Sequence, residues 1–138
     1  MVSSLLLDTC ALIFLTIDDG RAAKVRAALK NAHDAGETVF VSPISAWEIG
    51  LLASLGRVNL LTSPERWFDT VIETPGVRLA GLSPAVLIAS SFLPDAKWRD
   101  PADRIMAATA REYGFTLLTS DKQLLAYAAK GHIRALLC

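Results

Sequence analysis

Residues 5–9 read Leu5-Leu6-Leu7-Asp8-Thr9, an unbroken apolar run that ends at an acid and a hydroxyl. Short continuous apolar runs are typical of strands covered on both faces, as in a parallel sheet. The run therefore predicts a buried first strand with Asp8 at its carboxyl end. Similar runs rich in strand formers recur along the chain, and the predicted strands are residues 3–7, 38–42, 77–81, 115–119 and 133–137.

Helical patterns lie between these runs, and proline marks where most of them begin. A capping side chain directly before proline suits the N-cap and first position of a helix. This pair occurs at Ser42-Pro43, Ser63-Pro64, Ser83-Pro84 and Asp100-Pro101. The predicted helices are residues 21–35, 43–55, 64–74, 84–92, 101–113 and 120–130. Alternating strands and helices predict a three-layer α/β/α sandwich around a central, mainly parallel sheet, formed by a single domain over residues 1–138.

The composition limits the classes of function. The 138 residues carry 14 Lys and Arg against 14 Asp and Glu, so any affinity for nucleic acid must come from a local arrangement of charge. No apolar run approaches the roughly 20 residues of a membrane span, and no signal-peptide pattern is present, so we expect a cytoplasmic protein. Cys10 and Cys138 are expected to be free thiols in apolar surroundings.

Five acids are predicted to meet at one edge of the sheet. The carboxyl ends of parallel strands share an edge, where ligands tend to bind. Helical side chains lean toward the helix N-terminus, which directs an acid in a second helical turn to the same edge. The five acids are Asp8, Glu48, Asp100, Asp103 and Asp121.

Such a cluster suggests a metal site. Neighbouring carboxylates repel one another, and a divalent cation relieves that repulsion. Hard oxygen ligands suit Mg²⁺ or Mn²⁺, and a cation held this way can activate water and neutralise charge on a phosphodiester. Metal-dependent phosphodiester hydrolysis is the resulting hypothesis.

Four of these acids also have a purely structural interpretation. Asp8 suits a cap of the next turn, residues 9–12. Asp100 suits an N-cap, and Asp103 lies in the first turn of the same predicted helix. Asp121 is a similar first-turn acid if Ser120 is the N-cap. Glu48 has no such role, and in a largely apolar helix it needs a partner.

Several competing sites lack their motifs. The chain contains no glycine-rich dinucleotide loop, no P-loop and no G-x-S-x-G elbow. His33 and His132 are isolated, which disfavours a zinc site or a Ser-His-Asp triad. A phosphatase that uses Asp8 as phospho-acceptor would want a second acid at the position of Cys10.

Four segments in order resemble PIN-domain ribonucleases and, more narrowly, the VapC-type toxins of bacterial and archaeal toxin–antitoxin pairs. None of the segments is specific alone, and the resemblance covers nearly the whole chain. The segments are Leu6-Leu7-Asp8-Thr9-Cys10-Ala11-Leu12, Ser45-Ala46-Trp47-Glu48-Ile49-Gly50, Arg99-Asp100-Pro101-Ala102-Asp103-Arg104-Ile105 and Leu117-Leu118-Thr119-Ser120-Asp121.

The resemblance implies a metal-dependent endoribonuclease that uses Mg²⁺ or Mn²⁺. It places metal ligands at Asp8, Glu48 and Asp103, while Asp121 supports a second ion or orients water. Asp100 is an additional nearby acid. Thr119 and Ser120 are hydroxyl neighbours able to bond water or phosphate.

The resemblance also implies partners. It predicts a homodimer, a cognate antitoxin that inserts a segment into the acidic site, and structured RNA substrates such as transfer RNA. The apolar helices predicted at 43–55 and 64–74 leave hydrophobic surface for a protein partner. Many relatives have His before the Asp-Pro pair, where this chain has Trp98-Arg99. The positive charge that binds RNA is therefore assigned to other cations close to the acids in sequence, namely Lys97, Arg99, Arg104 and Lys122. The alternative interpretation of these four residues is ordinary solvated or ion-paired surface. A PIN-fold interaction module without turnover is the alternative function.

Overall fold

The computed structural model describes residues 4–16 and 20–138, in which strands and helices alternate along the chain. The strands are β1 (Leu5–Leu7), β2 (Val39–Val41), β3 (Val77–Leu79), β4 (Thr116–Thr119) and β5 (Arg134–Leu137). The helices are α1 (Thr9–Phe14), α2 (Gly20–Asp34), α3 (Pro43–Ser54), α4 (Pro64–Glu73), α5 (Pro84–Ser91), α6 (Pro101–Tyr113) and α7 (Lys122–Ala129).

The five strands form one sheet in the order β3-β2-β1-β4-β5, and every neighbouring pair is parallel. The predicted parallel sheet is therefore confirmed. Leu7 at the end of β1 is level with Val41 of β2 and Leu118 of β4. This register brings the residues that follow these three strands to the same edge.

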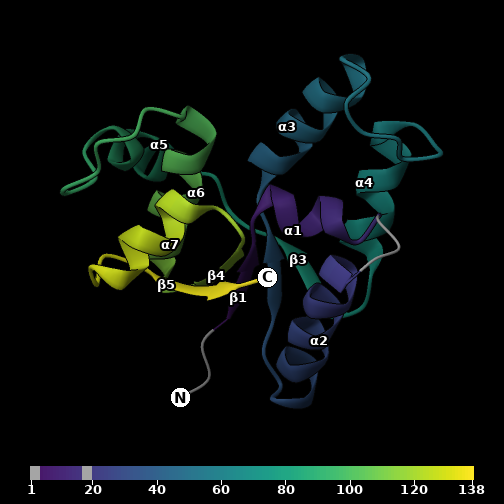
Figure 1. Ribbon diagram of the computed structural model, residues 1–138, viewed down its shortest axis with the longest axis horizontal. Coiled ribbons are helices and arrows are strands. Elements are labelled where there is room, and N and C mark those ends of the chain that lie inside the picture. Colours follow the sequence, from purple (N-terminus) through teal and green to yellow (C-terminus); the bar gives the residue numbers. More distant parts are fainter. Residues whose placement is uncertain (1–3, 17–19) are drawn as a thin grey trace.

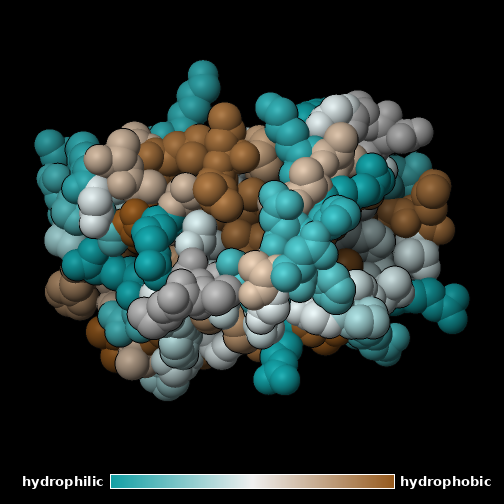
Figure 2. Space-filling view, turned by 90° about the horizontal axis from the view of Figure 1, so that it is seen from below, coloured by the Kyte–Doolittle hydropathy of each residue, from teal (hydrophilic) through white to brown (hydrophobic). Residues whose placement is uncertain are grey.

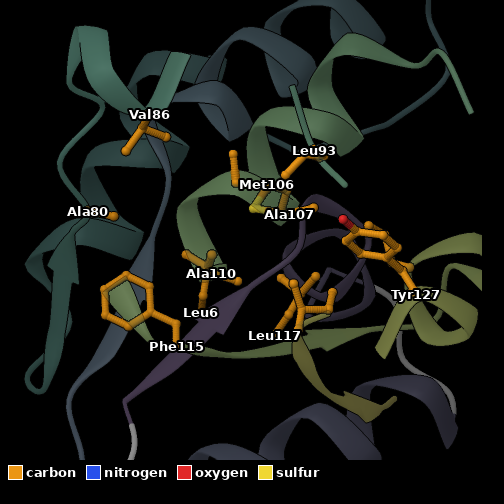
Figure 3. Packing of buried hydrophobic residues seen from close by; sticks show 13 residues of the cluster. Leu6, Ala80, Val86, Leu93, Met106, Ala107, Ala110, Phe115, Leu117 and Tyr127 are labelled. Atoms are coloured by element: carbon orange, nitrogen blue, oxygen red, sulfur yellow. The ribbon is translucent and has the colours of Figure 1, made fainter. Parts of the chain in front are cut away.

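Helices cover both faces of the sheet, as the three-layer prediction required (Figure 1). On one face, Leu6 and Leu117 point toward Met106 of α6 and Tyr127 of α7 (Figure 3). On the other face, Leu5, Leu7 and Leu118 pack with residues of α1, α2 and α4. Successive β1 residues thus pack into the cores on opposite faces of the sheet, which is why the leucine run is continuous.

The predicted helix starts are confirmed at all four capping pairs. Ser42, Ser63, Ser83 and Asp100 each accept a hydrogen bond from a backbone N–H of the first turn. The structural interpretation of Asp8 is also confirmed, because Asp8 caps the short helix α1. One detail differs from the prediction, since α7 is capped by Asp121 itself instead of Ser120.

Part of the surface is hydrophobic. Figure 2 shows a face on which hydrophobic residues gather in one area bordered by hydrophilic ones. On α3, Trp47, Leu51 and Leu55 are exposed, as predicted for this helix. On α4, Trp67 and Phe68 instead pack against the second core. Among the described residues, no helix has the length and apolar character to cross a membrane.

Candidate active site

The carboxyl edge of the sheet gathers the five predicted acids from four segments of the chain. Asp8 follows β1, Asp121 follows β4, Glu48 is on α3, and Asp100 and Asp103 begin α6. Their proximity is evident in their electrostatics, because the negative charges of the other four all raise the pKa of Asp103. The predicted acidic cluster is therefore formed.

Asp8 is held rigidly on both oxygens. Its side chain is only 5% exposed. Oδ1 accepts from the Thr9 N–H at 2.9 Å, and Oδ2 accepts from the Thr119 hydroxyl at 2.6 Å. Burial raises the pKa of Asp8, while these hydrogen bonds oppose the rise. Two adjacent strands thus fix one carboxylate at the centre of the edge.

Glu48 is linked to Asp8 through Thr9. The Thr9 hydroxyl donates to Glu48 Oε1 at 2.6 Å and lies 2.8 Å from the Ser45 hydroxyl. Because the single Thr9 hydroxyl proton goes to Glu48, Ser45 is the donor to Thr9. Burial, opposed by the Thr9 hydrogen bond, raises the pKa of Glu48. The partner that the sequence required for Glu48 is therefore Thr9.

Asp103 faces the cluster from the first turn of α6. Asp100 Oδ1 accepts from the Asp103 backbone N–H at 3.1 Å, so Asp100 is the N-cap. Burial, followed by repulsion from the other acids, raises the pKa of Asp103 to about 7. The capping interpretation is thus confirmed for Asp100, whereas Asp103 carries an electrostatic cost that a structural acid would avoid.

Asp121 and Ser120 continue the edge beyond β4. Asp121 Oδ1 accepts from the backbone N–H groups of Gln123 and Leu124 at 2.8 and 3.0 Å, which leaves Oδ2 outside the cap. The Ser120 hydroxyl lies 3.4 Å from Cys10 Sγ. Both residues therefore border the site, and Asp121 serves as a cap at the same time.

Cys10 is a correction to the sequence prediction. Its thiol lies among polar groups, donating to Asp8 Oδ2 at 3.4 Å and lying 3.8 Å from the Thr119 hydroxyl. The expected apolar surroundings apply only to Cys138, which is buried in the second core. Burial and the charge of Asp8 raise the pKa of Cys10, so the thiol stays protonated beside that carboxylate.

The basic residues predicted for RNA contact fall into two groups. Lys97, Arg99 and Lys122 are exposed near the acids in sequence. The Arg104 guanidinium, in contrast, donates to the backbone carbonyls of Ser90 and Trp98, each at 2.8 Å. Arg104 holds the segment between α5 and α6 in place, which gives it a structural role.

The donor chemistry of the edge fits a hard divalent cation, although the carboxylates are spread out. Within residues 4–16 and 20–138, no group of three or more His, Cys, Asp or Glu side chains is close enough to ligate one ion. The expected direct ligation of one ion by Asp8, Glu48 and Asp103 is therefore absent from this arrangement, since the unneutralised carboxylates repel one another. Magnesium commonly binds through one or two carboxylates and several waters, and that mode suits the spacing.

Thr9, Ser45 and Cys10 are the site residues that sequence reasoning missed. Thr9 directly follows Asp8, and Ser45 precedes Glu48 by almost one helical turn. Both positions could have been marked, because a buried carboxylate needs donors close by. Nothing in the sequence showed that these two hydroxyls would meet.

Comparison with known proteins places this arrangement in a family. Residues 5–130 match the PIN domain. The chain belongs to the PIN-domain family.

Its relatives agree with the narrower resemblance. Ribonuclease VapC22 of Mycobacterium tuberculosis is 33% identical over 101 residues, which are 73% of this chain and 76% of that protein. VapBC2 from Rickettsia felis, bound to a promoter DNA fragment, matches 96% of this chain and 97% of its own with a TM-score of 0.66 at 13% identity. DNA-bound VapBC from Salmonella typhimurium matches 98% of both chains with a TM-score of 0.65 at 18% identity. The two structural likenesses show the shared fold.

Proposed function

We propose that this chain is a VapC-type endoribonuclease that hydrolyses RNA phosphodiester bonds at its acidic edge. One observation carries the proposal: acids from separate segments meet at the carboxyl edge, where burial and then their mutual repulsion raise the pKa of Asp103 to about 7. A cluster with this electrostatic cost is typical of a functional site. The family and the similarity to a protein named as a ribonuclease support RNA as the substrate.

The cofactor in this proposal is Mg²⁺ or Mn²⁺, which would bind among Asp8, Glu48 and Asp103 through one or two of these carboxylates directly and through water to the rest. When bound, the cation supplies activation of water and neutralisation of the charge that develops on the scissile phosphate. The Thr9 hydroxyl bonds to Glu48 Oε1, which leaves Oε2 outside this bond. The hydrogen bond from Asp103 to Asp100 uses the backbone N–H of Asp103 and not its carboxylate. Glu48 Oε2 and the Asp103 carboxylate oxygens are therefore available to a ligand.

The protein's own part is to hold these groups in place. Thr119 and the Thr9 N–H fix both oxygens of Asp8, and the Thr9 hydroxyl fixes Glu48, so the two carboxylates need no reorganisation when the site is filled. Asp121 orients water or supports a second ion with the oxygen outside its cap. Ser120 adds a hydroxyl that can contact water or phosphate.

The RNA is bound through exposed cations beside the acids. Lys97, Arg99 and Lys122 are proposed phosphate contacts, because phosphate neutralisation supplies much of the affinity for nucleic acid. Structured RNA such as transfer RNA is the proposed substrate class. We leave Arg104 out of this set because its guanidinium is bonded to backbone carbonyls.

The proposed partners are a cognate antitoxin and a second copy of the chain. A groove of about 490 Å³ lies between α3 and α4, lined by Ala46, Gly50 and Phe68 and by the acids Glu65 and Asp69. An apolar floor with an acidic rim suits an amphipathic segment that carries basic residues. The solved VapBC structures of related fold support an antitoxin as that partner.

RNA cleavage by the purified protein tests the proposal. Replacing even an outer partner of a metal ligand typically costs about 10–100-fold, so Asp8→Asn should lower the cleavage rate by about 100-fold or more. The substrate is a pool of small RNAs with Mn²⁺ or Mg²⁺, read on a denaturing gel. The matched control is Glu73→Gln, which removes an exposed acid from the end of α4 and should cleave like the wild type.

The interaction-module alternative predicts a different outcome. A folded wild-type protein, free of antitoxin, that cleaves no RNA with either metal would favour a module without turnover. Equal cleavage by Asp8→Asn and the wild type would contradict the assigned site.

A further inference from the structure

Helix α7 lies on the side of the molecule away from α2 (Figure 1). Two openings lie along it. The first is a groove of about 190 Å³ beside α7, lined by Lys97, Trp98, Gln123 and Lys130, among others. The second is a cleft of about 470 Å³ that begins at the next residue, Gly131, and lies between the end of α6 and the start of β5. His132 Nε2 of the cleft lies 3.6 Å from Asp95 Oδ2 of the groove, so the two openings adjoin on the same flank.

The cleft presents two arginines in fixed positions. Arg111 donates through Nη1 to the backbone carbonyl of His132 at 2.8 Å, and Arg134 donates through Nη2 to the carbonyl of Gly114. A guanidinium has five N–H donors, so each arginine retains donors that these bonds leave unused. Fixed arginines with spare donors are suited to phosphate, which they can bind in a fork geometry.

The flank is positively charged although the chain is neutral overall. Lys97, Lys130, Arg111 and Arg134 line the two openings, against the acids Asp95 and Glu112. Asp95 partly compensates one end, because its Oδ2 lies 4.0 Å from Lys130 Nζ and 3.6 Å from His132 Nε2. The Lys130–Asp95 pair is half-exposed on both sides, and surface pairs of this kind are weak.

The flank also leads directly from the acidic edge. Asp121 caps α7 by accepting from the N–H of Gln123, and Gln123 lines the groove. The eight residues of α7 then span about 12 Å, ending at Lys130 beside the cleft. A strand that leaves the acidic edge along α7 would meet Lys97, Lys130 and then the arginine pair.

We propose that this flank is a second RNA-binding surface, in which Arg111 and Arg134 bind a phosphate of the substrate strand a few nucleotides from the scissile bond. The inference rests on the proposed ribonuclease function and extends it from the site of cleavage to the path of the RNA. Phosphates repeated along a strand match cations repeated along the flank, as in proteins that follow a nucleic-acid backbone. The two arginines are assigned to phosphate and not to base edges, so they contribute affinity and register.

Binding of fluorescent bulk transfer RNA in EDTA, between 50 and 200 mM salt, tests the proposal without requiring cleavage. Arg111→Gln/Arg134→Gln should weaken binding at 50 mM salt about tenfold. It should also reduce the slope of log affinity against log salt by about 0.7–0.9, the value for one lost phosphate contact. The matched control, Arg57→Gln/Arg66→Gln, removes two exposed cations near α3 and α4 and should leave the slope unchanged.

Arg111→Lys/Arg134→Lys separates charge from structure. It retains both charges while altering the bonds to the backbone, so it should restore the salt slope. An unchanged slope in the folded glutamine variant, or a lysine variant as weak as the glutamine variant, would overturn the inference. Failure of the wild type to cleave any RNA would instead contradict the proposed function, so the two failures are distinguishable.

Discussion

Asp103 is the site residue whose burial most clearly lowers the free energy of unfolding. Its pKa of about 7 lies far above the usual value of 3.8, with burial as the main cause. Between these values the folded protein holds a proton that the unfolded chain has released. The free energy of unfolding therefore falls as the pH rises from about 4 to about 7, and the full cost is present above that range.

Removing this charge should stabilise the protein. Asp103→Asn should raise the free energy of unfolding at pH 8 by about 0.5–2 kcal/mol, with a smaller gain at pH 5, because the wild-type carboxyl is already protonated there. Urea denaturation in EDTA at both pH values measures the effect, with Glu73→Gln as the control. A loss of stability at pH 8, or the same gain at both pH values, would refute this explanation.

Thr119 is the residue through which the fold positions Asp8. Its hydroxyl donates to Asp8 Oδ2 and accepts from the backbone N–H of Asp121. Thr119→Val leaves both of these groups short of a partner, so we expect a loss of about 1–3 kcal/mol in stability together with slower cleavage. Thr119→Ser keeps the hydroxyl and should restore both properties. Urea denaturation and the cleavage assay make the comparison, and cleavage by Thr119→Val at the wild-type rate would contradict this role.

Some site residues could be predicted from the sequence of the element that carries them, and others could not. Asp8 was predictable because the leucine run fixes where β1 ends, and Asp100 because a capping acid before proline marks the start of α6. The bond from Thr9 to Glu48 was not predictable, since it joins residues 39 positions apart. The cap of α7 was placed one residue early because Ser120 and Asp121 are both good capping residues, and only the backbone path chooses between them.

The groove between α3 and α4 is the proposed binding site of the antitoxin. Gly50 lines the groove, and a Cβ built there meets nothing within 4 Å, so a larger side chain fits without displacing the fold. Gly50→Arg should fill the groove and block the antitoxin while cleavage continues. Inhibition of RNA cleavage by the co-expressed antitoxin measures this, with Gly50→Ala as the conservative control. Undiminished inhibition of Gly50→Arg would place the antitoxin elsewhere.

Acidic and basic side chains gather on different parts of the molecule. Equal numbers of acidic and basic residues give a neutral chain, yet the acids gather at the carboxyl edge and cations follow the flank of α7. Composition predicted only that any charge for nucleic acid must be local. The location depends on crossovers that bring α3, α6 and α7 to the same edge, which sequence alone gives only as an expected topology.

The most direct test of the central claim measures metal binding and RNA cleavage in the same samples. Mn²⁺ is titrated into the protein at pH 7.5, its occupancy is followed by electron paramagnetic resonance, and the cleavage rate is recorded at each point. We predict that the rate rises in step with site occupancy in the wild type and in Glu73→Gln, and that Asp8→Asn loses both together. Cleavage by the wild type in EDTA, or full cleavage by Asp8→Asn, would contradict the claim that the acidic edge is a metal-dependent ribonuclease site.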